Sequence, residues 1–255
     1  MSLLLLAAVI TSDSLPPICT ERPGKANAVC TVPAGRVQIE TGLADWSLTK
    51  SRGARAEFVS LGATFVRVGL TDASELQAGI SPYSWLTVKE GGSKVRGKGF
   101  GDITLRYKRR LTGEDGPVQV GLIPFVKLPT AAHNIGNGKL EGGLAAPISF
   151  TPGGPVGITL GPEVDVLSDA DGGGYHAALV NLVNVGAPIA EKFTLSGELW
   201  TNFNFDPVGT VKQASADTAL AYLVSNDLQL DAGANFGLTR DTPDVEIYAG
   251  VSARF

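Results

Sequence analysis

The chain has 255 residues, which is enough for one large β domain or two small ones. It is mildly acidic, with 21 Lys and Arg against 25 Asp and Glu, so its charge gives no reason to expect nucleic acid as a partner. Only two His and one Met are present, and this scarcity argues against metal or acid–base chemistry. We therefore expect no metal and no cofactor.

Residues 1–13 are interpreted as a secretory signal. Leu3 to Ile10 form an apolar run that is too short to cross a bilayer as a helix, and polar residues follow it. No Lys or Arg precedes the run, which a misplaced start codon would explain, and the cleavage site is not defined. The alternative is a short buried strand or a disordered tail.

Residues 14–35 form a second segment, which contains the only two cysteines, Cys19 and Cys30. In an exported protein, two cysteines at this spacing predict one disulfide that closes a small loop. Such a closure contributes about 3 kcal/mol to stability. Two free thiols would fit only a cytosolic protein.

Apolar and polar residues alternate through residues 36–255, and no stretch keeps a helical period for three turns. The alternating segments are long for a soluble sandwich, but they suit strands that cross a bilayer at a tilt. About twelve such segments follow one another, centred near residues 42, 62, 81, 105, 122, 147, 161, 182, 199, 219, 233 and 250.

The predicted fold class is all-β: a transmembrane antiparallel up-and-down β-barrel of about twelve strands. Odd-numbered connections are mostly longer than even-numbered ones, as expected if the odd ones are extracellular. The two longest, 89–100 and 129–142, are both odd. Closure also removes the exposed edges that strands of this length would present. The alternative is a soluble sandwich, whose polar face looks outward.

The last alternating segment ends on Phe255, in the apolar register. In a barrel this aromatic ring would lie at the periplasmic interface, where aromatic side chains are enriched. It also resembles the C-terminal signature by which bacterial outer-membrane barrels are recognised for insertion. The expected location is therefore the bacterial outer membrane, and the expected partners are outer-membrane lipid and the barrel-insertion machinery.

The two faces of the strands are assigned by environment, because hydrocarbon offers no partner for a charge whereas a lumen does. Charged residues of the polar face, Glu57 among them, are therefore expected in the lumen. For the last strands, we expect Leu195, Leu199, Phe203, Leu230, Ala234, Ile247 and Val251 to face lipid and Glu198, Asn202, Asp231, Asn235, Glu246 and Arg254 to face the lumen.

Four stretches together resemble one family of bacterial outer-membrane proteins. They are VPAGRVQIETG at residues 32–42, GFGDITLRYKRRL at 99–111, GLIPFVKLPTA at 121–131 and, most specifically, the last hairpin at 226–255. The family is usually described as transporters, or as proteins of the meta-cleavage pathway of phenol degradation. The resemblance covers about residues 31–255. It implies an outer-membrane barrel that passes small hydrophobic compounds, and it brings no catalytic motif.

The candidate solute-binding or pore-lining residues are those expected on the polar face. Acids and bases share this face, so many of them can pair across the interior and leave the lumen narrow or closed. Ile123 and Phe125 also fall on this side, which leaves room for a small apolar pocket. The complete set is Arg67, Arg106, Lys108, Ile123, Phe125, Lys127, Glu163, Glu198, Asn202, Asp231, Asn235, Glu246 and Arg254.

Other chemistry finds little support. A hydrolase would need a Ser and a His side by side, and the sequence does not place Ser149 beside His133. Asp169 and Asp171 could offer oxygens to calcium, but the full loop pattern is absent, so a Gly-rich turn is favoured. A basic cluster, which includes Lys94, Arg96 and Lys98 in the 89–100 connection, could attract lipopolysaccharide phosphates or an anionic solute, or be a plain solvated loop.

The functional hypothesis is passive or facilitated passage of small, hydrophobic or aromatic molecules across the outer membrane, without enzymatic activity. Residues 14–35 would then lie in the lumen as a plug or stay in the periplasm. The alternatives are a structural or adhesive surface barrel with a closed lumen and, third, an outer-membrane lipid-modifying enzyme.

Overall fold

The structure is a computed structural model that describes residues 15–51, 53–113 and 115–255. The predicted signal segment, residues 1–13, lies outside the described residues. Across the described ranges, no helix is long and apolar enough to span a membrane.

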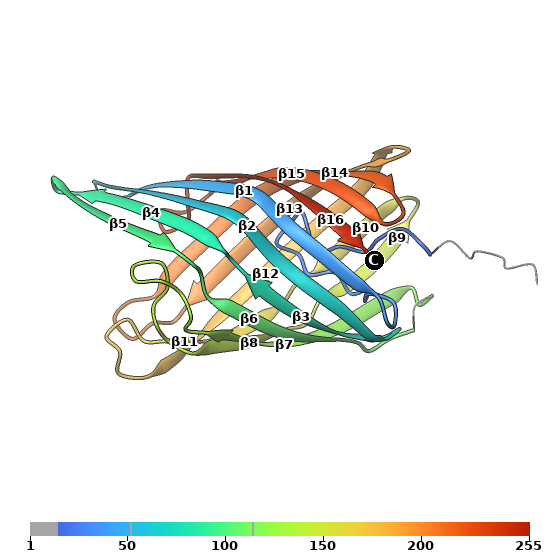
Figure 1. The fold of residues 1–255 in the computed structure, drawn as a ribbon, viewed down its shortest axis with the longest axis horizontal. Coiled ribbons are helices and arrows are strands. Elements are labelled where there is room, and N and C mark those ends of the chain that lie inside the picture. The colour runs from blue at the N-terminus through green and yellow to red at the C-terminus, as the bar shows by residue number, and fades with distance from the viewer. Residues whose placement is uncertain (1–14, 52, 114) are drawn as a thin grey trace, which may run out of the picture.

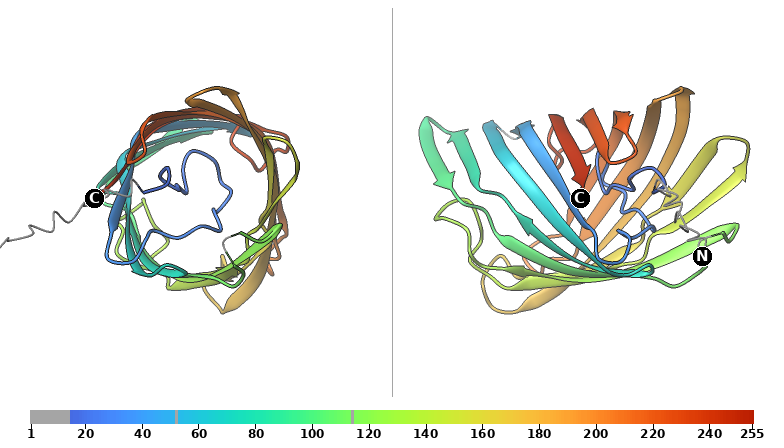
Figure 2. Two further views of the ribbon diagram at one scale, coloured as in Figure 1. Left: turned by 90° about the vertical axis from the view of Figure 1, so that its right-hand side faces the viewer. Right: turned by 45° about the vertical axis from the view of Figure 1, so that its right-hand side comes forward.

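The described strands form one sheet that closes on itself into a barrel of twelve wall positions (Figures 1 and 2). Eight positions are single strands: β1 (Val37–Ser51), β2 (Ala54–Thr71), β7 (Val118–Leu128), β12 (Tyr175–Ala190), β13 (Phe193–Asn204), β14 (Val211–Ser225), β15 (Leu228–Gly237) and β16 (Val245–Arg254). Four positions are each split in two: β3 (Ser74–Ile80) with β4 (Tyr83–Glu90), β5 (Ser93–Gly99) with β6 (Ile103–Arg110), β8 (Glu141–Ala145) with β9 (Ile148–Gly153), and β10 (Val156–Leu160) with β11 (Glu163–Ser168).

Closure comes from the first strand, which pairs with its neighbours on both sides. β1 pairs antiparallel with β2 and with β16, and Gln38 lies opposite both Arg67 and Arg254. The predicted all-β, antiparallel, twelve-strand barrel is therefore confirmed, and each predicted segment corresponds to one wall position.

Prolines explain most of the splits. Pro82 separates β3 from β4, Pro147 separates β8 from β9, and Pro162 separates β10 from β11. A proline has no backbone N–H to donate to the ladder, so regular pairing stops there. Single hydrogen bonds still join the wall at these points, such as the one from the Ala146 N–H to the Pro162 carbonyl at 2.9 Å. The wall therefore stays continuous.

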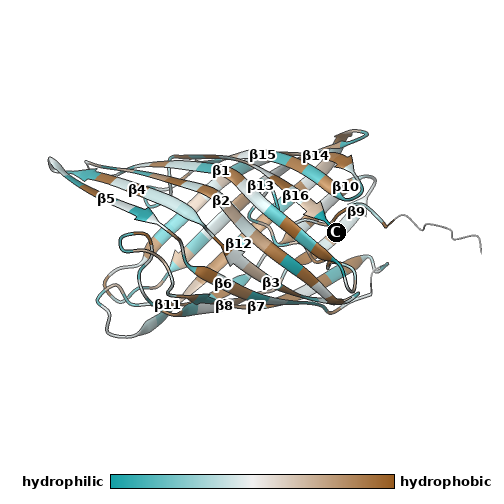
Figure 3. Ribbon diagram, viewed as in Figure 1, coloured by the Kyte–Doolittle hydropathy of each residue, from teal (hydrophilic) through white to brown (hydrophobic). Residues whose placement is uncertain are grey.

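The predicted assignment of the faces agrees with the exposure of the side chains. On β13, Leu199 is 61 % exposed, whereas its neighbour Glu198 is only 6 % exposed. The same contrast separates Ile247, which is exposed, from Asp231 and Arg254, which are buried. Figure 3 shows the hydrophobic and hydrophilic bands that alternate along the strands as a result.

The extracellular end differs from the prediction in one respect. The stretch 89–100, expected as a long loop, is mostly strand: β4 and β5 form a hairpin with a tight turn at Gly91 and Gly92, whose φ angles are +53° and +86°. Glycine adopts such angles without a steric penalty. The hairpin extends the wall at the end opposite the C-terminus (Figure 1).

A second difference concerns Glu57, which was expected in the lumen. The pairing of β1 with β16 shifts by one residue between Gly42 and Ala44, and Gly62, opposite on β2, has a φ of +71°. Because side chains alternate, such a bulge exchanges the two faces beyond it. Glu57 therefore lies on the outer face, in line with Val59 and Trp46, and Trp46 pairs with the lipid-facing Ile247.

We predict that an arginine is tolerated on the inner face of β13 and not on the outer face. Leu199→Arg should cost about 2–4 kcal/mol of folding free energy in lipid, because the charge would lie near the middle of the hydrocarbon. Ser196→Arg, on the same strand but directed into the lumen, should cost clearly less. Urea unfolding of both variants in lipid vesicles measures the difference. Equal losses of folding free energy in the two variants would contradict the assigned faces.

Candidate functional site in the barrel lumen

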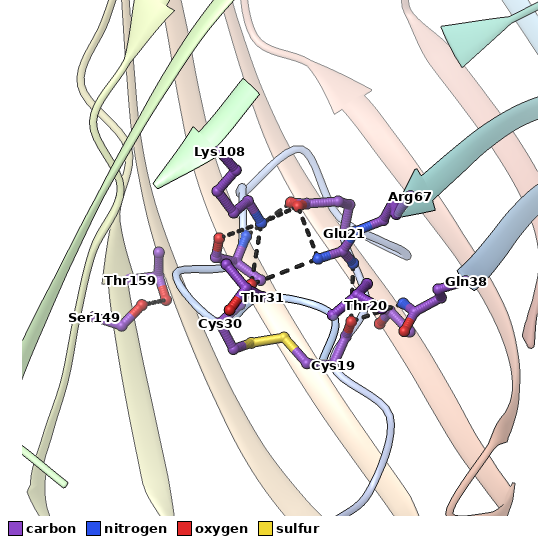
Figure 4. Close-up of a disulfide and its surroundings, with 12 residues drawn as sticks. Cys19, Thr20, Glu21, Cys30, Thr31, Gln38, Arg67, Lys108, Ser149 and Thr159 are labelled. Carbon is purple, nitrogen blue, oxygen red and sulfur yellow. Dashed lines mark hydrogen bonds and ion pairs between the residues drawn. A yellow bond between two sulfur atoms is a disulfide. The ribbon is translucent and has the colours of Figure 1, made fainter. Parts of the chain in front are cut away.

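The segment before β1 folds into the barrel. Figure 2 shows it inside the ring of strands when the molecule is viewed along the barrel axis. Cys19 and Cys30 form a disulfide with their Cα atoms 6.3 Å apart (Figure 4). We call residues 19–30 the disulfide loop.

A buried cluster of charges fixes the base of the disulfide loop to the wall. Arg67 on β2 is fully buried and forms ion pairs with Glu40 on β1 at 2.6 Å and with Glu75 on β3 at 2.8 Å. Lys108 on β6 is also fully buried and pairs with Glu21 of the loop. Its Nζ donates to the Ala28 carbonyl at 2.7 Å. The cluster therefore joins four strands to the loop; Figure 4 shows Arg67, Lys108 and Glu21 within it.

Glu21 is ionised in this cluster. Burial by itself would raise its pKa, but the positive charges of Lys108 and Arg67 outweigh burial and lower the pKa to about 2. The carboxylate of Glu21 also accepts the backbone N–H of Ala28 at 2.9 Å, across the base of the loop. The attachment at this point is therefore maintained throughout the neutral pH range.

Farther along the loop, at its tip, its contacts extend to the strands beyond β16. Arg22 pairs with Asp231 on β15 at 2.7 Å, and Lys25 pairs with Asp217 on β14 at 2.6 Å. On β13, Glu198 accepts the backbone N–H groups of residues 25 and 26 at 3.1 Å and 3.0 Å. Together with the contacts of its base, these bonds hold the loop across the lumen.

Two cavities lie on either side of the tip. One, of about 300 Å³, lies against β2, β3 and β6 and is lined by Phe65, Ile80 and Arg106. The other, of about 250 Å³, lies against β12 to β15 and is lined by Ser196 and Gln229. By strand direction, the first is nearer the extracellular end and the second nearer the periplasmic end. Loop residues 21–24, 26 and 27 line both, so the loop is the partition between them.

Five of the predicted site residues lie around the disulfide loop. Arg67 and Lys108 bind its base, and Glu198 and Asp231 bind its tip. Arg106 donates to the side chain of Asn27 and lies over the ring of Phe65, with 5.4 Å between the guanidinium carbon and the ring centre. The structure therefore brings together residues that are far apart in the sequence.

The other predicted polar residues lie elsewhere on the lumen wall. Lys127 pairs with Asp102 at 2.9 Å, and Arg254 pairs with Asp227 at 2.6 Å near the periplasmic end. The remaining polar contacts are those of Asn235 with Glu246 at 2.8 Å, of Asn202 with Gln213 at 3.5 Å and of Glu163 with Asp165 on the same strand.

Phe125 lies opposite Arg106 and Gly143, on the luminal face of β7, and the small apolar pocket beside Ile123 and Phe125 stays a prediction. Ile123 is fully buried. Phe125 contributes to an apolar groove of about 650 Å³ whose other lining residues include Leu76, Leu105 and Tyr107. These three side chains are exposed on the outer wall, so the groove opens toward lipid.

Several residues of the site were not identified from the sequence. Asp217 and Ser215, which hold Lys25, belong to a strand whose polar residues we had not singled out. Arg22 and Lys25 lie in the stretch ERPGK between the two cysteines. Charged residues in a short loop closed by a disulfide were the available signal, because the lumen of a barrel is lined mainly by polar residues.

The residues examined for catalysis do not come together. Ser149 forms a hydrogen bond with Thr159 at 2.8 Å, while His133 lies in the connection between β7 and β8. His176 bonds Asp169 at 2.8 Å and thereby ties the turn after β11 to β12.

The comparison with solved structures identifies the fold. The chain matches a COG4313 outer membrane channel from Pseudomonas putida F1 with a TM-score of 0.70 and 14 % identity, over 92 % of this chain and 99 % of that one. It also matches the NanC porin with a TM-score of 0.52 and 9 % identity, over 85 % and 98 % of the two chains. The fold is that of a bacterial outer-membrane β-barrel.

The family follows from the sequence. Residues 20–255 match the model of the family described as "Putative MetA-pathway of phenol degradation", and the chain belongs to this family. The match begins at residue 20, so it includes the disulfide loop except Cys19, whereas the resemblance noted from the sequence began at about residue 31. No curated protein matches the chain significantly.

We predict that the buried cluster is essential for stability. Arg67→Met should cost about 3–5 kcal/mol, because it leaves the carboxylates of Glu40 and Glu75 buried without their main cation. Arg55→Met, which breaks the exposed pair of Arg55 with Glu57, should leave the free energy of unfolding nearly unchanged. Urea unfolding in lipid vesicles compares the two. A small loss for Arg67→Met would show that the loop is held by other contacts.

Proposed function

We propose that this protein is a narrow outer-membrane channel for small aromatic molecules and that the disulfide loop is its plug. The observation that carries the proposal is the arrangement of the two cavities on opposite sides of a single loop. Displacing the tip of this loop would join them into one path. The porin-like fold and the family membership support a role in permeation.

The extracellular cavity suits an aromatic solute with one polar group. Phe65 offers its aromatic ring, and Ala63 adds apolar surface. Thr104 and Arg106 supply hydrogen-bonding groups beside them. Small-molecule sites commonly combine an apolar lining with a few placed polar groups, and about 300 Å³ is at the lower end of their volumes. The phenol pathway in the description of the family supports the same class of solute.

A closed structural barrel is the second candidate, and the ion pairs of the loop favour it. Arg22 and Lys25 both bind carboxylates that are almost completely buried. If these bonds never open, the lumen is closed. The two candidates differ in whether the loop tip can leave the wall.

The last strand, β16, supports a further part of the proposal, which concerns insertion into the membrane. β16 is paired with β1 along its whole length, and Phe255, just beyond it, is 65 % exposed. This exposed aromatic ring supports recognition of the strand by the barrel-insertion machinery.

We predict that releasing the loop tip opens the channel. The double variant Arg22→Gln and Lys25→Gln should conduct more than the wild type in planar bilayers, because the tip loses both ion pairs. It should also shift toward cation selectivity, because Asp231 and Asp217 then face the lumen without their cations. Lys192→Gln, on an exposed periplasmic turn, is the control. An unchanged current and reversal potential would favour the closed barrel.

We also predict that phenol blocks the current by occupying the extracellular cavity. Phe65→Ala should weaken the block, because it removes the ring against which a solute would stack. Phe203→Ala, on the lipid face, should leave it unchanged. The concentration that halves the current is the measurement. A conducting wild type that phenol does not block would refute the aromatic solute and leave the channel itself standing.

A further inference from the structure

The extracellular extension of the wall has a row of four basic side chains. Lys50 on β1 lies opposite Arg55 on β2, Arg55 lies opposite Lys89 on β4, and Lys89 lies opposite Lys94 on β5. Directly opposed residues of adjacent strands point to the same face of a sheet. The four cations are therefore immediate neighbours across four strands, and all four are exposed.

The row lies on the outer face of the barrel. Lys50 is four residues after Trp46 on β1, so the two side chains share a face. Trp46 pairs with Ile247, which faces lipid. On β5, Arg96 and Lys98 follow Lys94 at intervals of two residues and continue the same face. We call this surface the cationic face; it consists of Lys50, Arg55, Lys89, Lys94, Arg96 and Lys98.

The cationic face has an excess of positive charge, although the carboxylate of Asp244 accepts the backbone N–H of Lys50 at 2.7 Å. Within the described parts of the chain, the only carboxylate that forms an ion pair with it is Glu57, which binds Arg55. Like charges placed directly opposite one another across strands are destabilising. A chain with a net charge of −4 has nevertheless gathered six cations here. An external anion would remove this repulsion.

The position of the cationic face along the membrane normal indicates which anion it contacts. Trp46, Tyr83 and Trp85 lie on the same outer face, closer to the middle of the barrel. Trp and Tyr are enriched where the hydrocarbon meets the head groups. Lys50 and Lys89 each follow one of these Trp residues by four positions, which is roughly 13 Å along a strand and less along the membrane normal. The row of Lys50, Arg55, Lys89 and Lys94 therefore lies at the level of the head groups of the outer leaflet, and Lys98, opposite Trp85, lies at the level of the aromatic side chains.

We propose that the cationic face binds the phosphate groups of the phosphorylated glycolipid, lipopolysaccharide, in the outer leaflet. Several amino and guanidinium groups in one row can contact more than one phosphate at once. Acyl chains of the same lipid would pack below, against the aromatic side chains. This binding depends on the outer-membrane location and is independent of the proposed channel function.

The test uses the purified full-length protein in detergent with EDTA present, and lipid A as the probe. Native mass spectrometry counts the bound lipid. The wild type should bind lipid A that has both phosphates and should bind the dephosphorylated form much more weakly. Lys89→Gln together with Lys94→Gln should weaken binding of the phosphorylated form by roughly tenfold or more. High salt should weaken it as well.

The matched control removes two exposed cations elsewhere at the same end of the barrel. Lys212 lies on the outer face of β14 opposite Phe203, and Arg240 lies in the connection before β16. Lys212→Gln with Arg240→Gln should bind lipid A like the wild type. In urea unfolding, the Lys212 and Arg240 variant should match the wild type, and the Lys89 and Lys94 variant should be at least as stable, because all four side chains are exposed and the second variant loses a cross-strand repulsion.

Three results would overturn the proposal. The first is equal binding of lipid A by the wild type and by the Lys89 and Lys94 variant. The second is equal binding of phosphorylated and dephosphorylated lipid A. The third is displacement of lipid A by inorganic phosphate at the same phosphate concentration, which would make the surface a site for free phosphate.

Discussion

The structure depends on one set of buried charges, in which Arg67 and Lys108 meet Glu21, Glu40 and Glu75. Burying charges is expensive, and only complete pairing offsets the cost. Here two cations and three carboxylates come from the loop and from four neighbouring wall strands. The wall by itself pairs Arg67 with Glu40 and Glu75, but the contact of Lys108 with Glu75 is long, at 3.8 Å. The loop adds Glu21 as the closer partner of Lys108, so insertion of the loop completes the pairing of the buried charges.

The attachment of the loop base to the wall sets the shape of the lumen. With its base fixed, the disulfide loop extends to β13, β14 and β15, where Glu198, Asp217 and Asp231 are its partners. The base is held by fully buried ions, whereas the cations of the tip, Arg22 and Lys25, remain partly exposed. Exposed charges lose less when their bonds break, because water replaces the partner. Movement of the loop tip on a fixed base is therefore the motion with the smallest electrostatic cost.

Much of the fold was predictable from the sequence, and particular residues show why. Alternation on β13 and β15 placed Leu199 outside and Asp231 inside, because the period of two is a local property of the chain. The splits at Pro82, Pro147 and Pro162 were also present in the sequence as residues that cannot donate a hydrogen bond. The compartment and the spacing of Cys19 and Cys30 predicted the bond that the structure contains.

The site was less predictable, because its contacts join residues that are distant in the chain. Arg22 meets Asp231, which is 209 residues away, and no local pattern encodes that pairing. Sequence reasoning placed Arg67, Lys108, Glu198 and Asp231 in the lumen but could not assign them a partner. The apolar pocket expected beside Ile123 and Phe125 stays a prediction for a related reason. Whether Phe125 and its neighbours enclose a space depends on the packing of adjacent strands rather than on the alternation within one strand.

The bulge at Gly42 and Gly62 determines both the charges that line the lumen and the cations on the outer face. Without it, the period of two would continue along β1 and β2, and Lys50 and Arg55 would point into the lumen mouth. The one-residue shift turns them outward while Glu40 and Arg67, before the shift, stay inside. The same two strands thus present charges to the lumen at the periplasmic end and to the outside at the extracellular end. A position that needs a φ of +71° is best filled by glycine, so this small residue determines which charges line the lumen and which face the outer leaflet.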